Sequence, residues 1–286
     1  MAIVLGANQY GKAEIRLLHV HRDGPPDVIT DLNVSVTLAG QLTATHLSGD
    51  NAAVLTTDAQ KNTVYAFAQE HGVGAIEDFA LRLARHFVAS QAAITLARVT
   101  VEQYPWERLD GHTFVRSGAE IRTATVSHDG TDSWVVSGLR DLTVLKSAGS
   151  EFWGFARDRY TTLAPTSDRI LATAVQARWR HARPEAAGGW AESYGAAREA
   201  MLAAFAGTHS YSLQQTLFAM GQRVLAARPE IAEIRLALPN KHHFDVDMSP
   251  FGLPNTGAVY SVSDRPYGLI EGTIIRDDAP PAGKAW

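Results

Sequence analysis

Strand-like and helix-like segments follow one another along this 286-residue chain in an order that occurs twice. The order is strands, a pair of helices, and strands again. The strand-like segments are residues 14–22, 32–38, 94–101, 113–126, 134–144, 170–180, 234–238, 244–246, 259–262 and 269–275. The helical segments are residues 63–69, 77–90, 191–205 and 213–227. This repeated order predicts duplicated α+β units, although the two halves share no visible sequence identity.

The first two strand-like segments show how strongly the pattern constrains the fold. In residues 32–38 apolar and polar residues alternate strictly, from Leu32 to Leu38. The turn-forming run Asp23-Gly24-Pro25-Pro26-Asp27 separates this segment from residues 14–22. Alternation around such a turn predicts an antiparallel hairpin with one buried face.

The composition excludes several classes of site and partner. The chain has no cysteine, which rules out disulfides, thiolate catalysis, zinc–thiolate sites and cysteine-bound iron–sulfur clusters. Its formal net charge is −4, whereas a nucleic-acid-binding protein normally carries a clustered basic excess. No apolar run reaches the roughly 18 residues of a membrane span. We therefore expect no nucleic-acid partner and no membrane association.

Neither end of the chain shows a recognisable targeting signal. The N-terminus lacks the basic start and long apolar stretch of a signal peptide, and the C-terminus lacks the Ser-Lys-Leu signal of peroxisomal proteins. The absence of cysteine fits a reducing compartment. A cytoplasmic protein is therefore expected.

Residues 6–13 nearly match the phosphate-binding loop of nucleotide-binding proteins. In that loop Gly-Lys is followed by serine or threonine, but here Ala13 replaces the hydroxyl that would bind magnesium. The loop must also open a helix, whereas the residues after Lys12 are strand-like. We therefore expect no phosphate site at this segment.

Residues 241–247 contain two histidines and two aspartates, which suggests a metal site. On a strand, alternation places His243, Asp245 and Asp247 on one face and His242 on the other. Three donors on one face could hold a metal weakly, but a solvated polar face is the simpler interpretation. His242 shares its face with apolar neighbours, so it is either a core histidine or a site residue.

Several short segments, spread in a fixed order over nearly the whole chain, resemble the uricase family. They are Asn8-Gln9-Tyr10-Gly11-Lys12, Thr56-Thr57-Asp58-Ala59-Gln60-Lys61-Asn62-Thr63-Val64-Tyr65, Leu142-Thr143-Val144-Leu145-Lys146-Ser147, Phe152-Trp153-Gly154-Phe155, Arg157-Asp158-Arg159-Tyr160-Thr161-Thr162-Leu163, Asp168-Arg169-Ile170-Leu171-Ala172-Thr173, Leu238-Pro239-Asn240-Lys241-His242 and Asp264-Arg265-Pro266-Tyr267-Gly268-Leu269-Ile270-Glu271. Each alone is weak evidence, but the set in register leaves little room for coincidence.

The resemblance implies the tunnelling fold, an α+β fold with two ββααββ units per chain and helices on one face of an antiparallel sheet. Two subunits close a barrel of strands, and two barrels stack into a homotetramer with active sites at subunit interfaces. Closure removes unpaired sheet edges, which otherwise invite aggregation. We expect a first unit at residues 1–130, a second unit at 131–278 and a flexible C-terminal tail at 279–286.

The resemblance also implies an activity: oxidation of urate by O2 and water to 5-hydroxyisourate and hydrogen peroxide, without metal or organic cofactor. Urate that loses a second proton becomes an electron-rich dianion, which can pass electrons one at a time to oxygen. The protein then contributes position and electrostatics.

The implied purine-binding residues include an aromatic face and a charged clamp. Phe152 is similar to the family's stacking aromatic, a contact worth roughly 1–3 kcal/mol; the alternative is a core phenylalanine. Arg169 and Gln214 resemble the pair that grips one edge of the purine, since a guanidinium donates two parallel hydrogen bonds to an anion. The alternatives are an ion pair of Arg169 with Asp168 and a solvated helix position for Gln214.

Further implied contacts complete the pocket. Leu163 and the backbone at Leu213 fit its walls, although the family more often has valine where Leu213 stands. Thr57 and Asp58 match a pair that the neighbouring subunit contributes to the other edge of the purine. Their alternative is a helix start with an acidic first turn, and both interpretations can hold together.

The implied proton relay consists of Lys12, Thr57 and His242, and Asn240 resembles the residue that orients oxygen or water above the ring. Lysine becomes a usable base when desolvation or a nearby positive charge lowers its pKa. The alternative for Lys12 is an ordinary surface lysine.

Three other functions stay open at this point. A metal-dependent purine or pterin enzyme of the same fold is disfavoured because the chain has no cysteine ligand. A non-catalytic purine-binding relative would retain the clamp without the relay, whereas both sets are present here. A purely structural oligomer would not bind urate, so a urate titration separates it.

Overall fold

The computed structural model describes residues 1–22, 26–185 and 189–286, so the predicted turn residues Asp23, Gly24 and Pro25 lie outside the described residues. An eight-stranded sheet dominates, in the order β1-β2-β3-β6-β7-β8-β9-β10, and every neighbouring pair in it is antiparallel. Strands β4 and β5 form a separate two-stranded sheet. The strands in chain order are β1 (Tyr10–His21), β2 (Val28–Gly40), β3 (Ile94–Tyr104), β4 (Trp106–Asp110), β5 (Thr113–Arg116), β6 (Ile121–His128), β7 (Ser133–Lys146), β8 (Leu171–His181), β9 (Ile231–Asp245) and β10 (Tyr260–Ile275). The helices are α1 (Thr43–Ser48), α2 (Thr57–His71), α3 (Ile76–Ser90), α4 (Trp190–Gly207), α5 (Leu213–Ala227) and the 3-10 turn η1 (Ser249–Phe251).

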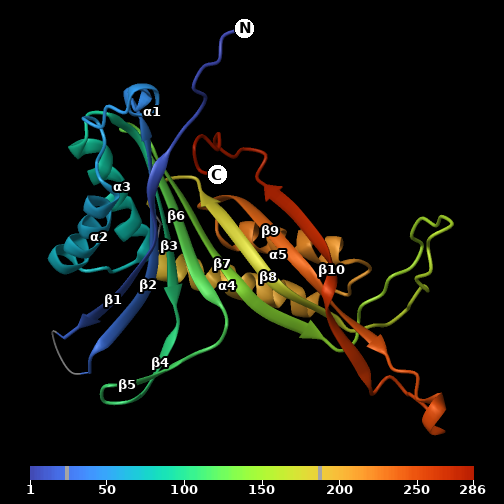
Figure 1. The fold of residues 1–286 in the computed structure, drawn as a ribbon. Helices are drawn as coiled ribbons and strands as arrows, with labels where there is room; N and C mark the ends of the chain where they lie inside the picture. The colour runs from blue at the N-terminus through green and yellow to red at the C-terminus, as the bar shows by residue number, and fades with distance from the viewer. Residues whose placement is uncertain (23–25, 186–188) are drawn as a thin grey trace.

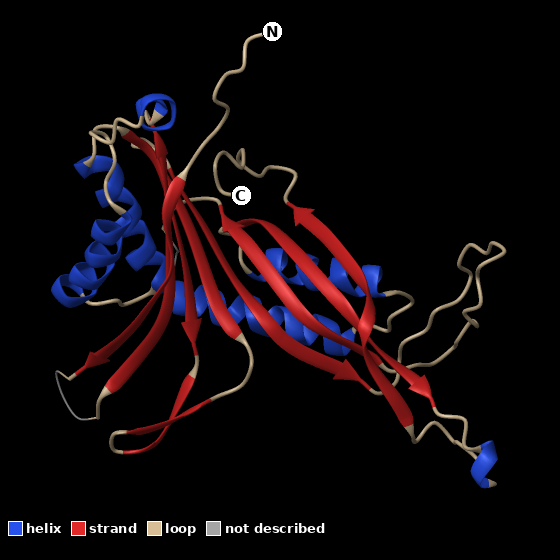
Figure 2. Cartoon of the chain, viewed as in Figure 1, coloured by secondary structure: helices blue, strands red, loops and turns tan. Residues whose placement is uncertain are grey.

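The four long helices cover one face of the large sheet (Figures 1 and 2). The register shows why this face is continuous between the two halves. Val126 lies opposite Val135, and Ser137, two residues further along β7, lies opposite Trp179. Residues two apart on a strand share a face, so the apolar side chains of both halves point to the same side.

The buried core has two centres, one in each half. Phe79, Phe87 and Val99 belong to a cluster formed mainly by β1–β3, β6, α2 and α3, which Val135 of β7 and Trp190 of α4 join from the second half. Trp179 and Met220 belong to a second cluster formed by β7–β10, α4 and α5. The order ββααββ therefore occurs twice, which confirms the predicted α+β class and its duplicated plan. We propose residues 130 and 131 as the boundary, because they lie in the turn between β6 and β7.

Both halves carry a bulge in their first strand, beside a non-glycine residue of positive φ. The β1–β2 register shifts between Lys12 and Ile15, where Glu14 has a φ of 58°. The β7–β8 register shifts between Leu139 and Leu142, and Asp141 has a φ of 63°. Such bulges re-aim the side chains beside them.

Local signals account for some element ends and fail at others. Helix α5 matches its predicted range, and Ser212 caps it by accepting a hydrogen bond from the Gln215 backbone N–H at 3.2 Å. Helix α2 begins earlier than predicted, where Thr56 caps it. The strand predicted at residues 113–126 is wrong, since it divides into β5 and β6. Conversely, each pair of short strands predicted late in the chain forms one long strand, β9 or β10.

The last eight residues pack against the helix-free face of the sheet. This ordered packing differs from the flexible tail expected from the sequence. The Trp286 ring lies 3.8 Å from the Arg235 guanidinium, and Arg98 donates to the backbone oxygens of Lys284 and Trp286 at 2.9 and 2.7 Å. Ala285 is buried. The tail thereby spans from the second unit to β3 of the first.

Helix length and polarity also bear on the membrane prediction. Within residues 1–22, 26–185 and 189–286, every helix is too short or too polar to cross a bilayer.

Candidate active site

A pocket of about 510 Å³ lies where the β7–β8 loop, the start of α5 and the outer parts of β9 and β10 meet. Figure 1 shows this loop and the β9–β10 arm projecting from the body of the sheet. The pocket brings together seven of the predicted site residues: Phe152, Leu163, Arg169, Leu213, Gln214, Asn240 and His242. These seven residues come from three separate segments, the β7–β8 loop, α5 and β9, so the fold rather than sequence proximity assembles them.

Phe152 provides the aromatic surface of the pocket. Its backbone N–H and carbonyl both bond to Thr166 at 2.9 Å. This antiparallel bridge holds the two ends of the β7–β8 loop together. Its ring stacks on Phe155 at 5.0 Å, and the Arg169 guanidinium lies 5.0 Å from the ring centre. Phe152 is half-buried and lines a pocket, so the alternative of a core phenylalanine does not describe it.

Arg169 enters the pocket with unused hydrogen-bonding capacity. Its Nε is buried and has no hydrogen-bond partner among the described residues. Burial lowers the pKa of the guanidinium from its ordinary value. The Asp168 carboxylate instead accepts from the backbone N–H groups of Gly149 and Arg169, at 2.9 and 3.1 Å. A buried donor without a partner is costly, so this arrangement favours an anionic or carbonyl-rich ligand.

Gln214 and Leu213 occupy the first turn of α5. Leu213 is buried and forms part of the second core, whereas the Gln214 side chain is exposed and lines the pocket. The cap at Ser212 and the bond from the Tyr211 N–H to the Gln215 side-chain carbonyl at 2.8 Å fix this turn. Gln214 therefore lines the same pocket as Arg169, as a second polar group of its wall.

Asn240 and His242 reach the pocket from β9. They share the strand face of Leu238, beyond the part that the helices cover. The His242 and Phe244 rings stack at 5.5 Å. Burial, followed by the charges of Arg169 and His243, lowers the pKa of His242, which keeps the imidazole neutral near pH 7 and able to accept a proton.

The other three predicted residues form a separate group in the first unit. Lys12 lies on β1 beside the bulge, and Thr57 and Asp58 begin α2. Asp58 bonds Lys61 at 2.6 Å, and this contact, followed by weaker effects that include the charge of Lys12, lowers the pKa of its carboxyl. None of the three lines the pocket of this chain.

Several lining residues were not predicted from the sequence. They are Ala164, Thr166, Asp168, Ile170, His243, Phe244, Asp245, Tyr260 and Ile270. Most of them adjoin a predicted residue on the same segment, so closeness in sequence to a predicted residue was the only signal that could have indicated them. The sequence pattern favours a solvated face or a weak metal site for His243 and Asp245. No three histidine, aspartate or glutamate side chains gather into a metal-binding group in the part of the chain that the structure describes.

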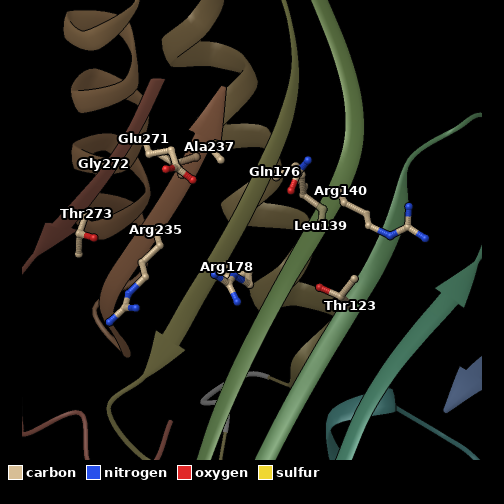
Figure 3. Close-up of a pocket in the computed structure, with 11 residues that line it drawn as sticks. Thr123, Leu139, Arg140, Gln176, Arg178, Arg235, Ala237, Glu271, Gly272 and Thr273 are labelled. Carbon is tan, nitrogen blue, oxygen red and sulfur yellow. The ribbon is translucent and has the colours of Figure 1, made fainter. Parts of the chain in front are cut away.

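Two further features resemble binding sites, but the fold and the charges around them account for both. The segment similar to a phosphate loop continues into β1, not a helix, and Gly11 is required because a Cβ there would lie 1.9 Å from the Val36 carbonyl oxygen. A second hollow, of about 560 Å³, lies on the helix-free face of the sheet (Figure 3). Of its arginines, Arg140 pairs with Glu102 at 3.1 Å and Arg235 with Glu233 at 2.8 Å. The charges of these two arginines are therefore already compensated.

Comparisons with known proteins give matches along almost the whole chain. A model of the family described as Uricase matches residues 8–127 and 135–271. The chain is 49% identical over 286 residues to a uricase of Arthrobacter globiformis, covering 99% of this chain and 94% of the relative. It is 36% identical over 279 residues to a uricase of Danio rerio, covering 93% of each. The crystal structure of uricase from Arthrobacter globiformis matches with a TM-score of 0.95 at 49% identity, covering 98% of both chains. A uricase structure from Bacillus fastidious, at 23% identity and a TM-score of 0.82 over 96% of both chains, shares the fold.

Proposed function

The chain belongs to the uricase family, and from this premise we propose that it oxidises urate with O2 and water to 5-hydroxyisourate and hydrogen peroxide. The observation that carries the proposal is the buried Arg169 Nε, which has no protein partner in the described chain and lies beside the Phe152 ring. A flat purine anion stacked on Phe152 supplies the missing acceptor. Gln214 then bonds the same edge of the purine.

We propose that His242 takes part in moving the proton whose loss makes urate a reductant. A neutral imidazole within the pocket can accept a proton, and its lowered pKa keeps it in that form. Lys12 and Thr57 are proposed as the remaining members of the relay. Asn240, two residues from His242 on the same strand face, is proposed to orient oxygen or water over the ring.

The reaction is proposed to proceed without metal or organic cofactor, because the urate dianion is itself the electron donor. A purified sample treated exhaustively with chelator should still consume urate and release hydrogen peroxide in equal amounts. Absorbance of urate and a peroxide assay follow the two together, and elemental analysis counts bound metal. Stoichiometric metal whose removal abolishes turnover would refute cofactor independence, and urate loss without peroxide would refute the reaction.

We further propose that the active site is shared between two subunits of a homotetramer. Lys12, Thr57 and Asp58 lie in the first unit, whereas the pocket is built from the second, so a neighbouring subunit can supply what the pocket lacks. The edges β1 and β10 of the open sheet are then available to close a barrel of strands from two chains. A cytoplasmic location is proposed as well, since the cysteine-free chain suits a reducing compartment.

Mixed oligomers test the shared site. Thr57→Ala and Arg169→Ala proteins are refolded together in equal amounts and assayed at a urate concentration at which each is nearly silent alone. Random pairing makes about half the dimers mixed, and one of two sites in each mixed dimer is native, so roughly a quarter of wild-type activity should return. If native mass spectrometry finds mixed oligomers without recovered activity, each chain builds its site alone.

A further inference from the structure

Two walls of the pocket, Phe152 and Gln214, come from segments far apart in the sequence, and a charged residue outside the pocket joins them. We infer that Glu151 is a positioning residue that fixes the stacking ring relative to the clamp through His209. This inference rests on the proposed function and deepens it, because it concerns how the same site holds a purine.

The Glu151 carboxylate bonds to both segments at once. One oxygen lies 2.6 Å from His209 Nε2, and the other accepts a hydrogen bond from Trp153 Nε1 at 2.6 Å. Trp153 directly follows Phe152, and His209 stands just before the cap of α5. The Glu151 side chain is 19% exposed, whereas its partners His209 and Trp153 are more open to solvent, so the carboxylate is the sheltered end of both bonds.

The backbone continues the same junction. The Glu151 N–H donates to the Ser210 carbonyl at 2.7 Å, and the Ser210 N–H donates to the Gly149 carbonyl at 3.0 Å. The Ser210 side chain is buried, accepts from the Thr216 hydroxyl at 2.8 Å and donates to the Ser212 carbonyl at 3.0 Å. A movement of Glu151 is therefore transmitted to the first turn of α5, which carries Gln214.

The charges around Glu151 keep it ionised. Hydrogen bonds from Trp153 and then His209 lower the pKa of Glu151, against the smaller opposing effects of burial and then of Asp168. Asp168 itself accepts from the Gly149 N–H at 2.9 Å, so its carboxylate is also held within this junction. An ionised acceptor makes stronger bonds than a neutral one, and loss of the carboxylate releases Trp153 and His209 together.

The test compares Glu151→Ala and Glu151→Gln with Glu192→Gln, a matched control that removes a carboxylate paired with Arg228 at 2.9 Å on the surface of α4. Glu151→Ala should raise the KM for urate about ten-fold and weaken calorimetric binding of xanthine by a similar factor, with kcat and the thermal midpoint close to the control. Glu151→Gln, which retains one acceptor, should fall between. His209→Phe should reproduce the Glu151→Ala effect, and the double variant should add nothing because the two residues act as one unit.

Equal KM and equal xanthine affinity in Glu151→Ala and Glu192→Gln would overturn the inference, as would a loss confined to kcat. Full additivity of Glu151→Ala and His209→Phe would also overturn it. A wild-type protein that binds xanthine but does not oxidise urate would overturn the proposed function, while the xanthine comparison would still decide the role of Glu151. A wild-type protein that binds neither purine would overturn both.

Discussion

His181 makes the protein's stability depend on pH in a way that the structure allows us to calculate. The imidazole lies on β8 beneath Trp190, whose ring is 5.0 Å away, and its Nε2 lies 3.1 Å from the Ser137 hydroxyl. Burial lowers the pKa of His181 to about 4, with smaller effects from the charges of Glu230, which raises it, and Arg228, which lowers it. The native state therefore holds this histidine neutral at pH values where the unfolded chain protonates it.

The sign and size of the pH-dependent change in the free energy of unfolding follow from proton linkage. Well above pH 6.5 neither state binds the proton, so the histidine has no effect on the free energy of unfolding. Below that value the unfolded state alone takes up the proton, and stability is lost as pH falls toward the native pKa. The gap of roughly 2.5 pKa units corresponds to a loss of about 3 kcal/mol per subunit by pH 4, of which about 1.4 kcal/mol is lost by pH 5.5.

Urea unfolding at a fixed protein concentration, between pH 7.5 and 5.5, measures the effect. His181→Asn removes the titrating group, so this variant, although destabilised at every pH, should lose about 1.4 kcal/mol less than wild type over this range. His71→Asn, which replaces a half-exposed histidine on α2, is the control and should follow the wild-type pH dependence. Identical pH dependence in wild type and His181→Asn would show that His181 is not held neutral in the native state.

Other substitutions have equally definite outcomes. Arg169→Ala should raise KM and weaken xanthine binding roughly a hundred-fold with a smaller change in kcat, because it removes a buried bidentate donor; unchanged xanthine affinity by calorimetry would contradict its role in the clamp. Lys12→Ala should lower kcat by roughly 10²-fold or more with little change in xanthine affinity, and an unchanged kcat across pH would remove Lys12 from the relay. Gly11→Ala should destabilise the β1–β2 pairing by more than about 2 kcal/mol, since its Cβ would meet the Val36 carbonyl, whereas Gly6→Ala, which meets nothing within 4 Å, should be neutral in thermal unfolding.

The sequence predicted the regular parts of this fold well because their signals are local. Helix α5 combines helical spacing with the Ser212 cap, and both lie within one short segment. The long strand β9 was predicted only as two short strands, since Pro239 normally marks a strand end and the apolar alternation lapses after it. Its neighbours on both sides hold it in the sheet: Asn240 pairs with Thr173 on β8 and with Gly268 on β10. Tertiary pairing of this kind is invisible in a single segment.

The pocket residues also divide into those with a local sequence signal and those that only the tertiary fold brings together. Motif resemblance named Phe152, Arg169 and His242 because each stands within a recognisable segment. It gave no indication of Glu151 and His209, whose contact depends on the isolated parallel pairing of Ser150 with Ser210. Nor could it show that the Arg169 Nε lacks a partner, because that follows from where Asp168 bonds instead.

The ladder between β6 and β7 joins two cores that otherwise fold as repeats of one plan. Residues 121–128 pair with residues 133–140 along their whole length, and Trp190 of α4 donates to Asp78 of α3 at 2.6 Å. A protease that cut the turn between these strands would leave both fragments bound to each other, and the nicked molecule would keep its shape. Either fragment made alone would present a bare strand edge, at β6 or β7, with apolar side chains on one side. Split versions of this protein should therefore be co-expressed, since each half serves as the folding partner that keeps the other from aggregating.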